Sequence, residues 1–310
     1  MIGSLKQLYE ILVKNGKDWD VLESLGYSIK NADSNVKYYQ YKIDTLPEWK
    51  YFISDLDWTF YRGFTIELTI DYFVNYVKSL SINSISLESY KNFIEDYYYF
   101  SKIKQKAYNR EVDFMLYLDV GIYFLYKYID KFDYENFIKF LRDILHIKLI
   151  VNPYRFSIKK LNEVLQKGMK FLFISWASHF IFDLYLDLLK KYISNLYGKD
   201  LADNIYWFWS YSDFESKTIY NLWSYEQKKE FIKQIKDKKN IEIVWGMGDT
   251  ISDFWIADNV VSWKDFYFVN PDYKVIEEFE KYKRNDINYH FINERKGFYF
   301  EYFIDDIRIF

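Results

Sequence analysis

The chain has 310 residues, which is enough for a large core and a second module. Half of the residues are hydrophobic and 28% are charged, as in folded proteins, and the formal net charge of −3 argues against a dedicated nucleic-acid-binding protein. Because there is no cysteine and there are three histidines, the sequence excludes disulfides and thiolate chemistry and argues against a metal site built from several histidines.

Neither an export signal nor a membrane span is evident in the sequence. The N-terminus scatters charges among its apolar positions and lacks the pattern of a signal peptide. The most apolar stretch, residues 171–189, is interrupted by Asp183 and contains His179, so a buried strand followed by a helix fits it better than a spanning helix. We therefore expect a cytoplasmic protein without a membrane span.

The first half of the chain is predicted to be mostly helical. Residues 1–48 contain one amphipathic helix, over about 5–13, followed by polar turns. Residues 49–54 form a short apolar run that predicts a buried strand. From about 65 to 146, apolar residues recur at three- and four-residue spacing, as in 134–145, which predicts a block of helices.

After Asn152-Pro153 the pattern changes to alternating strands and helices. In chain order we expect a helix over 157–168 with Ser157 as its cap and Gly168 as its stop, a strand over 170–175, a helix over 178–197, a hairpin of 205–211 and 218–223, a helix over 226–236, a strand over 241–245 and a hairpin within 289–310. Alternation on both sides of a helical block is typical of an open parallel sheet with a helical insertion. The predicted fold class is therefore α/β, with a doubly wound, Rossmann-like parallel core sheet and an inserted, mostly α-helical domain.

Two aspartates follow the first predicted strand. Asp55 and Asp57 are two residues apart, so they point the same way if the backbone is still extended. An aspartate can accept a phosphoryl group covalently, and a second carboxylate beside it can protonate the leaving oxygen. Ligands bind at the carboxyl ends of strands in an open α/β sheet, so the pair is a candidate catalytic site. Because Asp-x-Asp is a common pattern, two solvated loop aspartates are the alternative.

A second acidic pair follows the strand over 241–245. This strand runs into the turn Gly246-Met247-Gly248, and then Asp249 and Asp253 lie four residues apart at the start of a predicted helix, where both can face one point. Carboxylate oxygens are the ligands that Mg²⁺ prefers. Capping of the helix N-terminus explains one acidic residue but not both together with the glycines, so a metal site is the favoured interpretation.

Two further positions are candidates for binding the oxygens of a phosphate. Ser175 ends a predicted strand ahead of a helix, where its hydroxyl and the backbone N–H groups can bind an anion, and simple capping of the helix is the alternative. A cation is also needed beside several carboxylates. Lys228, near the start of a predicted helix, is the best-placed candidate, with Lys229 and Lys217 as competitors and an ordinary solvated lysine as the alternative.

Taken in this order, the segments resemble the haloacid dehalogenase (HAD) superfamily of aspartate-nucleophile phosphatases, over about residues 50–279. The family's four motifs match, in order, Asp55-Leu56-Asp57-Trp58-Thr59, then Ser175, then Lys228, and finally Gly248-Asp249 with Asp253. The resemblance implies a HAD-like catalytic core over 49–64 and 155–284, a helical cap domain over 65–154, a largely helical N-terminal extension over 1–48, and a C-terminal extension over 285–310 that forms a hairpin.

The branch of the superfamily is indicated by residues around the motifs. An insertion between the first and second motifs, with Arg62-Gly63 and Asn270-Pro271-Asp272, resembles the phosphoserine-phosphatase-like branch, subfamily I. Two positions depart from it. Trp58 stands where many relatives have glycine, and Phe64 stands where true phosphoserine phosphatases carry the glutamate that holds the substrate amine. Phosphoserine is therefore a poor candidate, and a less polar phosphoester is expected.

The resemblance implies a Mg²⁺-dependent phosphatase that acts on a small phosphomonoester. The implied roles are Asp55 as nucleophile, Asp57 as general acid and base, Asp55, Asp57 and Asp249 as metal ligands, Ser175, Trp176 and Lys228 as substrate-binding residues, and Thr59 and Asp253 as supporting residues. An acid at position 57 favours phosphatase chemistry over the dehalogenase and ATPase branches. A phosphotransferase with the same residues and a catalytically silent HAD-fold binding protein remain the alternatives, and the sequence leaves the oligomeric state open.

Overall fold

The computed structural model describes residues 4–15, 22–63, 65–80, 86–129, 131–148, 153–222, 224–294 and 300–302. Phe64, one of the two positions that depart from the phosphoserine phosphatases, lies outside the described residues. The chain divides into two compact units. Unit 1 comprises Met1–Lys30, Thr65–Ile144 and Ser212–Ile219, and unit 2 comprises Asn31–Phe64, Leu145–Tyr211 and Tyr220–Phe310.

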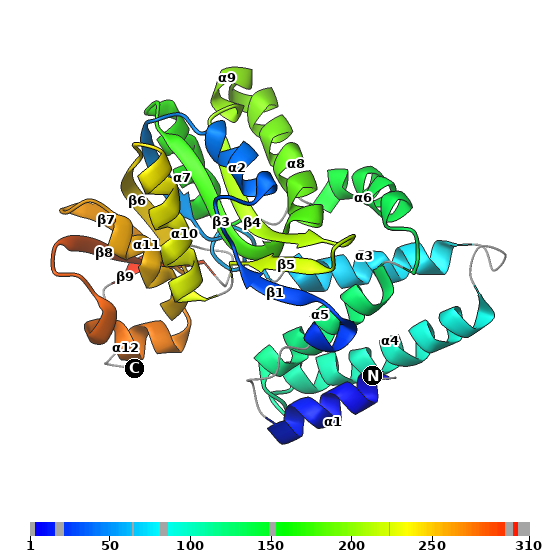
Figure 1. The fold of residues 1–310 in the computed structure, drawn as a ribbon. Helices are drawn as coiled ribbons and strands as arrows, with labels where there is room; N and C mark the ends of the chain where they lie inside the picture. The colour runs from blue at the N-terminus through cyan, green and yellow to red at the C-terminus, as the bar shows by residue number, and fades with distance from the viewer. Residues whose placement is uncertain are drawn as a thin grey trace. The chain divides into compact units, whose positions relative to one another are not determined.

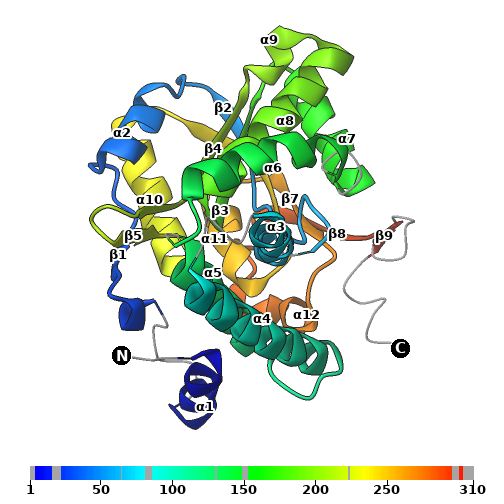
Figure 2. The ribbon, with the colours of Figure 1, turned by 90° about the vertical axis from the view of Figure 1, so that its right-hand side faces the viewer.

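Unit 1 is built mainly from helices. These are α1 (Leu5–Asn15), the 3-10 helix η1 (Glu23–Leu25), α3 (Thr65–Ser79), α4 (Leu87–Tyr108), α5 (Phe114–Ile129) and most of α6 (Tyr134–Lys148). α4 and α5 run side by side (Figures 1 and 2). Their apolar stripes meet in an aromatic core, in which the ring of Phe93 lies 5.9 Å from that of Phe73 and 5.2 Å from that of Phe124. The predicted block of helices is therefore confirmed.

One sheet of nine strands runs through the described chain, in the order β1-β5-β4-β3-β2-β6-β7-β8-β9. The strands are β1 (Ser28–Asn31), β2 (Lys50–Ser54), β3 (Lys170–Ser178), β4 (Ile205–Asp213), β5 (Thr218–Asn221), β6 (Glu242–Gly248), β7 (Lys264–Val269), β8 (Ile287–Asn293) and β9 (Phe300–Tyr302). Neighbours from β4 to β8 are parallel, and β9 is antiparallel to β8. Because β2 lies between β3 and β6, the sheet is wound outward in both directions from β2, as predicted, and its topological switch point lies there.

Helices cover both faces of the parallel strands in unit 2 (Figure 1). On one face, α2 (Lys37–Asp44), α10 (Tyr225–Lys238), α11 (Phe254–Asn259) and α12 (Tyr273–Tyr282) share a core with Tyr51 and Ile53. On the other face, Phe52 stacks on Tyr267 with ring centres 6.4 Å apart, and Phe156 of α7 (Arg155–Gln166) packs against Tyr267 at 5.4 Å. Since both faces are covered, the central strands are apolar along their length rather than alternating.

Two further helices complete unit 2. α8 (His179–Tyr197) packs through Phe182 against Trp209 of β4, with ring centres 5.4 Å apart, and the short α9 (Lys199–Ala202) follows it. Among the described residues, none of the helices combines the length and the apolar character that crossing a membrane requires.

The structure corrects the prediction at several places in the chain. β3 runs to Ser178, so Ser175 lies within the strand and not at its end, and β6 runs to Gly248. α7 begins after Tyr154 as its N-cap and not after Ser157, because the Ser157 hydroxyl donates to the carbonyl oxygen of Thr59 at 2.6 Å. Residues 1–48 contain β1 and α2 in addition to α1, where the sequence predicts polar turns. β1 is mostly exposed and has no apolar alternation, so its pairing in the sheet and not its own pattern makes it a strand.

Candidate active site

The register of the sheet brings three strand ends to one level. Ser54 of β2 pairs with Phe173 of β3 and with Met247 of β6. Ser175 lies two residues after Phe173, and Asp249 lies two residues after Met247. The turn that contains Asp55 directly follows Ser54, so it begins beside both of them. Residues from the first, second and fourth predicted motifs therefore meet at the carboxyl edge of the sheet, at its switch point, where ligands bind in open α/β folds.

The turn after β2 buries both of its aspartates. Asp55 is 5% exposed and Asp57 is 3% exposed. The N–H of Phe60 donates to the carbonyl oxygen of Leu56 at 2.8 Å, which closes the turn. Trp58 has a φ of 58°, a left-handed conformation that costs a non-glycine residue roughly 1–2 kcal/mol. A positive φ is a conformation that glycine adopts without this cost.

Gly246 and Gly248 lie in β6 and not in a turn as predicted, and Gly248 makes room for a carboxylate. A Cβ at Gly248 would lie 2.2 Å from the Cβ of Asp253, and a Cβ at Gly246 would lie 2.4 Å from a side chain of α11. Asp253 lies in the 3-10 helix η3 (Ile251–Asp253), and its Oδ2 accepts the N–H groups of Asp249 and Thr250, both at 3.0 Å. The two glycines therefore allow α11 and Asp253 to approach the backbone of β6.

Gly248→Ala is expected to lower the free energy of unfolding by about 1–3 kcal/mol, because the added methyl group overlaps Asp253 and forces it away from β6. Urea unfolding monitored by circular dichroism measures this change. A value within about 0.5 kcal/mol of wild type would show that Asp253 does not depend on the close approach.

Lys228 is a buried lysine that faces the acidic cluster. It is 2% exposed and lies in the first turns of α10. Its Nζ donates to Oδ1 of Asp55 at 3.1 Å and lies 3.5 Å from Oδ1 of Asp253. The third motif predicted from the sequence is thus in direct contact with the first and the fourth.

The two competing lysines lie elsewhere. Lys229 is half-exposed and pairs with Asp258 at 3.0 Å. Lys217 is exposed and belongs to unit 1. Of the three candidates, Lys228 is the one that the structure brings to Asp55.

Thr59 and Ser175 contribute two buried hydroxyl groups. Thr59 is fully buried, and its hydroxyl donates to Oδ1 of Asp249 at 2.7 Å. Ser175 is also fully buried, but its Oγ has no hydrogen-bond partner among the described residues. Leaving a buried hydroxyl unsatisfied costs free energy, which a ligand oxygen bound by Ser175 would offset. Trp176 follows Ser175 in β3 and is partly exposed.

Negative charge exceeds positive charge in the cluster. The carboxylates of Asp55, Asp249 and Asp253 are buried together, and the ammonium group of Lys228 pairs with those of Asp55 and Asp253. Burial raises the pKa of Asp55 to about 6, with Lys228 opposing this shift and Asp253 adding to it. Burial and repulsion from Asp253 and Asp55 hold the pKa of Asp249 well above its usual range. Burial alone lowers the pKa of Lys228, but attraction to Asp55 and Asp253 raises it overall.

The three carboxylates fit a divalent cation. Asp55, Asp249 and Asp253 each offer one oxygen, and these oxygens all lie within 4.8 Å of one another. Mg²⁺ prefers carboxylate oxygens, and its positive charge would oppose the burial and the mutual repulsion that raise the pKa values of Asp55 and Asp249. The HAD resemblance assigns Asp57 to the metal, through its main-chain carbonyl group, and Asp253 to a supporting role. Both of these assignments stay predictions.

Two residues that contact the cluster were not predicted. The centre of the Trp255 ring lies 5.8 Å from Nζ of Lys228, and the hydroxyl of Thr250 donates to Oδ2 of Asp253 at 3.0 Å. Both lie close to Asp249 and Asp253 in the chain, and this closeness is the feature of the sequence that could have indicated them.

The comparisons with known proteins found similar structures. No family model and no curated protein sequence matches this chain. Among solved structures, a HAD family hydrolase from Salmonella enterica serovar Typhi is 15% identical, with a TM-score of 0.38 over 76% of this chain and 67% of that chain. A probable phosphoserine phosphatase from Vibrio cholerae is 12% identical, with a TM-score of 0.41 over 74% of this chain and 58% of that chain.

A third similar structure is cytosolic 5'-nucleotidase IIIB bound to cytidine. It is 14% identical, with a TM-score of 0.38 over 81% of this chain and 84% of that chain. At these identities and TM-scores the likenesses carry no argument about activity, so the function has to rest on the site itself.

Proposed function

We propose that this chain is a phosphatase of the HAD type, which hydrolyses a small phosphomonoester with Asp55 as its nucleophile. The observation that carries the proposal is the buried contact of Asp55 with Lys228, 3.1 Å long, at the switch point of a doubly wound sheet. A carboxylate can receive a phosphate only where cations offset the combined negative charge. This site contains one ammonium group and three carboxylates whose oxygens lie within 4.8 Å of one another.

In the proposed reaction a carboxylate oxygen of Asp55 attacks phosphorus, the bond to the leaving oxygen breaks, and an aspartyl-phosphate forms. Asp57 gives a proton to the leaving alcohol and then takes one from the water that hydrolyses the intermediate. The hydroxyl of Ser175 and the ammonium group of Lys228 bind the phosphoryl oxygens, and Lys228 offsets the charge of the transition state.

Neighbouring side chains orient these groups. Thr59 fixes the carboxylate of Asp249 through a hydrogen bond, and Asp253 holds the backbone after β6 and the ammonium group of Lys228. A Mg²⁺ ion bound by Asp55, Asp249 and the carbonyl group of Asp57 would neutralise charge on the phosphoryl group and fix its orientation.

The stability of the metal-free protein is expected to fall as the pH rises from about 4 to about 6. The carboxyl group of Asp55 has a pKa of about 6 in the folded protein, against 3.8 normally, so the folded state binds more protons than the unfolded state in this window. The raised pKa of Asp249 acts in the same direction.

Binding of Mg²⁺ requires deprotonated carboxylates, so Mg²⁺ should raise the Tm more at about pH 7 than at about pH 5. Thermal unfolding with Mg²⁺ and with EDTA at both pH values measures the two effects. Equal Mg²⁺-induced shifts of Tm would contradict the link between the metal and these carboxyl groups.

The proposed activity is tested by phosphate release from p-nitrophenyl phosphate with Mg²⁺ and with EDTA. We expect turnover that depends on the metal. Absence of release from this ester and from a broad panel of phosphomonoesters would overturn the hydrolase and favour a silent binding protein. Phosphorylated product that increases with an added acceptor alcohol would identify a phosphotransferase instead.

A further inference from the structure

A buried carboxylate lies at the end of β8, outside the four motifs. Glu294 directly follows β8, and its side chain is 0% exposed. Burying a carboxylate is costly unless it is paired or hydrogen-bonded, so its partners indicate why it is there. It also belongs to the C-terminal part of the chain that has no counterpart in the HAD motifs.

The carboxylate of Glu294 holds the first turn of α7. Its Oε1 accepts the N–H of Arg155 at 2.7 Å, and its Oε2 accepts the N–H of Phe156 at 2.9 Å. These are the first N–H groups of the helix, and the N-cap residue is Tyr154, a residue type that does not usually cap with its own side chain. Glu294 therefore acts as the cap, and its negative charge also interacts favourably with the helix dipole.

Glu294 also holds the segment that follows the turn after β2. Nη2 of Arg62 lies 3.2 Å from Oε1 of Glu294, and the guanidinium group lies 4.8 Å from the centre of the Tyr154 ring. The N–H of Tyr154 donates to the carbonyl oxygen of Phe60 at 2.9 Å. The segment that leaves the turn and the start of α7 are thus bound together by one carboxylate.

The first turn of α7 in turn holds the residues of the candidate site. The hydroxyl of Ser157 donates to the carbonyl oxygen of Thr59 at 2.6 Å. The hydroxyl of Thr59 donates to Oδ1 of Asp249 at 2.7 Å. A shift of the first turn of α7 therefore moves Thr59 directly, and with it Asp57 and the hydrogen bond to Asp249.

The main chain of Glu294 is tied to the same edge of the sheet. Its N–H donates to Oδ1 of Asn270 at 2.6 Å, and the N–H of Asn270 donates to the carbonyl oxygen of Ile292 at 2.7 Å. In the same loop, the N–H of Asp272 donates to the carbonyl oxygen of Asp249 at 3.0 Å. The main chains of Glu294 and Asp249 are thus both hydrogen-bonded to the loop over 270–272.

We propose that Glu294 is a positioning residue, which fixes the turn carrying Asp57 and Thr59 by holding the first turn of α7. Its effect on catalysis rests on the proposed phosphatase function. Its effect on how firmly the turn is held does not depend on that function, so the two effects can be tested separately.

Glu294→Gln tests the inference with little change in shape. The amide offers one acceptor oxygen in place of two, so one N–H of the first turn of α7 loses its partner. We expect kcat to fall by about 10–100-fold, as for other residues that orient a site from outside, while KM changes by less than about threefold. Hydrogen exchange at the amides of Phe60 and Tyr154, measured without metal or substrate, should become faster.

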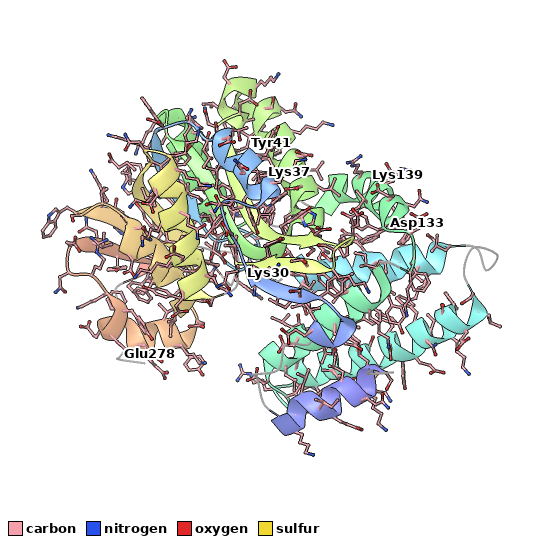
Figure 3. All side chains as sticks on the ribbon, in the orientation of Figure 1. Lys30, Lys37, Tyr41, Asp133, Lys139 and Glu278 are labelled. Atoms are coloured by element: carbon pink, nitrogen blue, oxygen red, sulfur yellow. The ribbon has the colours of Figure 1, made fainter. Side chains whose placement is uncertain are left out.

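The matched control is Asp133→Ala, at the start of α6 in unit 1 (Figure 3). Oδ1 of Asp133 accepts the N–H of Asn136 at 3.2 Å, so this substitution also removes an acidic group from a helix N-terminus. We expect it to leave kcat and the exchange of both amides unchanged.

The route through α7 is tested with Ser157→Ala, which leaves Glu294 in place and removes the hydrogen bond to Thr59. If Glu294 acts through this contact, the double variant should lose less activity than the product of the two single losses. A wild type without turnover would refute the phosphatase, while the amide exchange would still decide this inference. Unchanged amide exchange in Glu294→Gln, or an unchanged kcat beside an active wild type, would overturn it.

Discussion

The Asp55→Asn variant is expected to release phosphate at least about 10⁴-fold more slowly than wild type, because the amide cannot replace the carboxylate as the attacking group. The variant should still fold. The substituted side chain keeps an oxygen for the ammonium group of Lys228, and it removes one negative charge from a cluster with an excess of carboxylates. We therefore expect the Tm of the metal-free protein to be unchanged or higher. Assays with p-nitrophenyl phosphate and thermal unfolding measure the two effects.

The control for this variant is Asp237→Asn, an identical chemical change at an exposed position of α10. It should behave as wild type in both measurements. Wild-type activity of Asp55→Asn, in preparations free of contaminating phosphatase, would exclude Asp55 as the nucleophile.

The Lys228→Met variant is expected to lose about 3–5 kcal/mol of unfolding free energy in the metal-free protein, because buried carboxylates lose the ammonium group that offsets them. Its kcat should fall by about 10²–10³-fold, as when a group that stabilises transition-state charge is removed. Urea unfolding in EDTA and steady-state kinetics in Mg²⁺ measure these losses.

The neighbouring Lys229→Met provides a matched comparison. Lys229 is half-exposed and pairs with Asp258, so its loss should change the unfolding free energy by about 0–1 kcal/mol and leave kcat unchanged. Combining Lys228→Met with Asp55→Asn should recover part of the lost stability, since it removes a carboxylate that lost its partner. Similar effects of the two lysine substitutions would contradict the assignment of Lys228.

The candidate site was predictable because parallel strands align their carboxyl ends. Asp55, Ser175 and Asp249 each follow an apolar run that is short enough to be a buried strand, and the register of β2 with β3 and β6 brings these ends together. The choice of Lys228 over Lys229 also has a local signal. Lys228 lies three and four residues before Phe231 and Ile232, so it is on the buried face of α10.

Other features depend on tertiary contacts and leave no local pattern. Glu294 caps a helix that begins 139 residues earlier in the chain, and nothing in the residues around Glu294 indicates that partner. Ser157 has the residue type and the position of a helix cap, but its hydroxyl bonds to Thr59 instead. β1 is a strand only because it pairs at the edge of the sheet, since its exposed residues lack alternation.

The central claim is that the carboxylate of Asp55 carries the phosphoryl group during turnover. Acid quenching of the wild-type protein during turnover of a phosphomonoester with Mg²⁺, followed by mass spectrometry of its peptides, tests this most directly. We predict that the peptide containing Asp55 gains the mass of one phosphoryl group at Asp55 and not at Asp57. Steady turnover under the same conditions without phosphorylation of Asp55, or with the phosphoryl group on Asp57, would contradict the account.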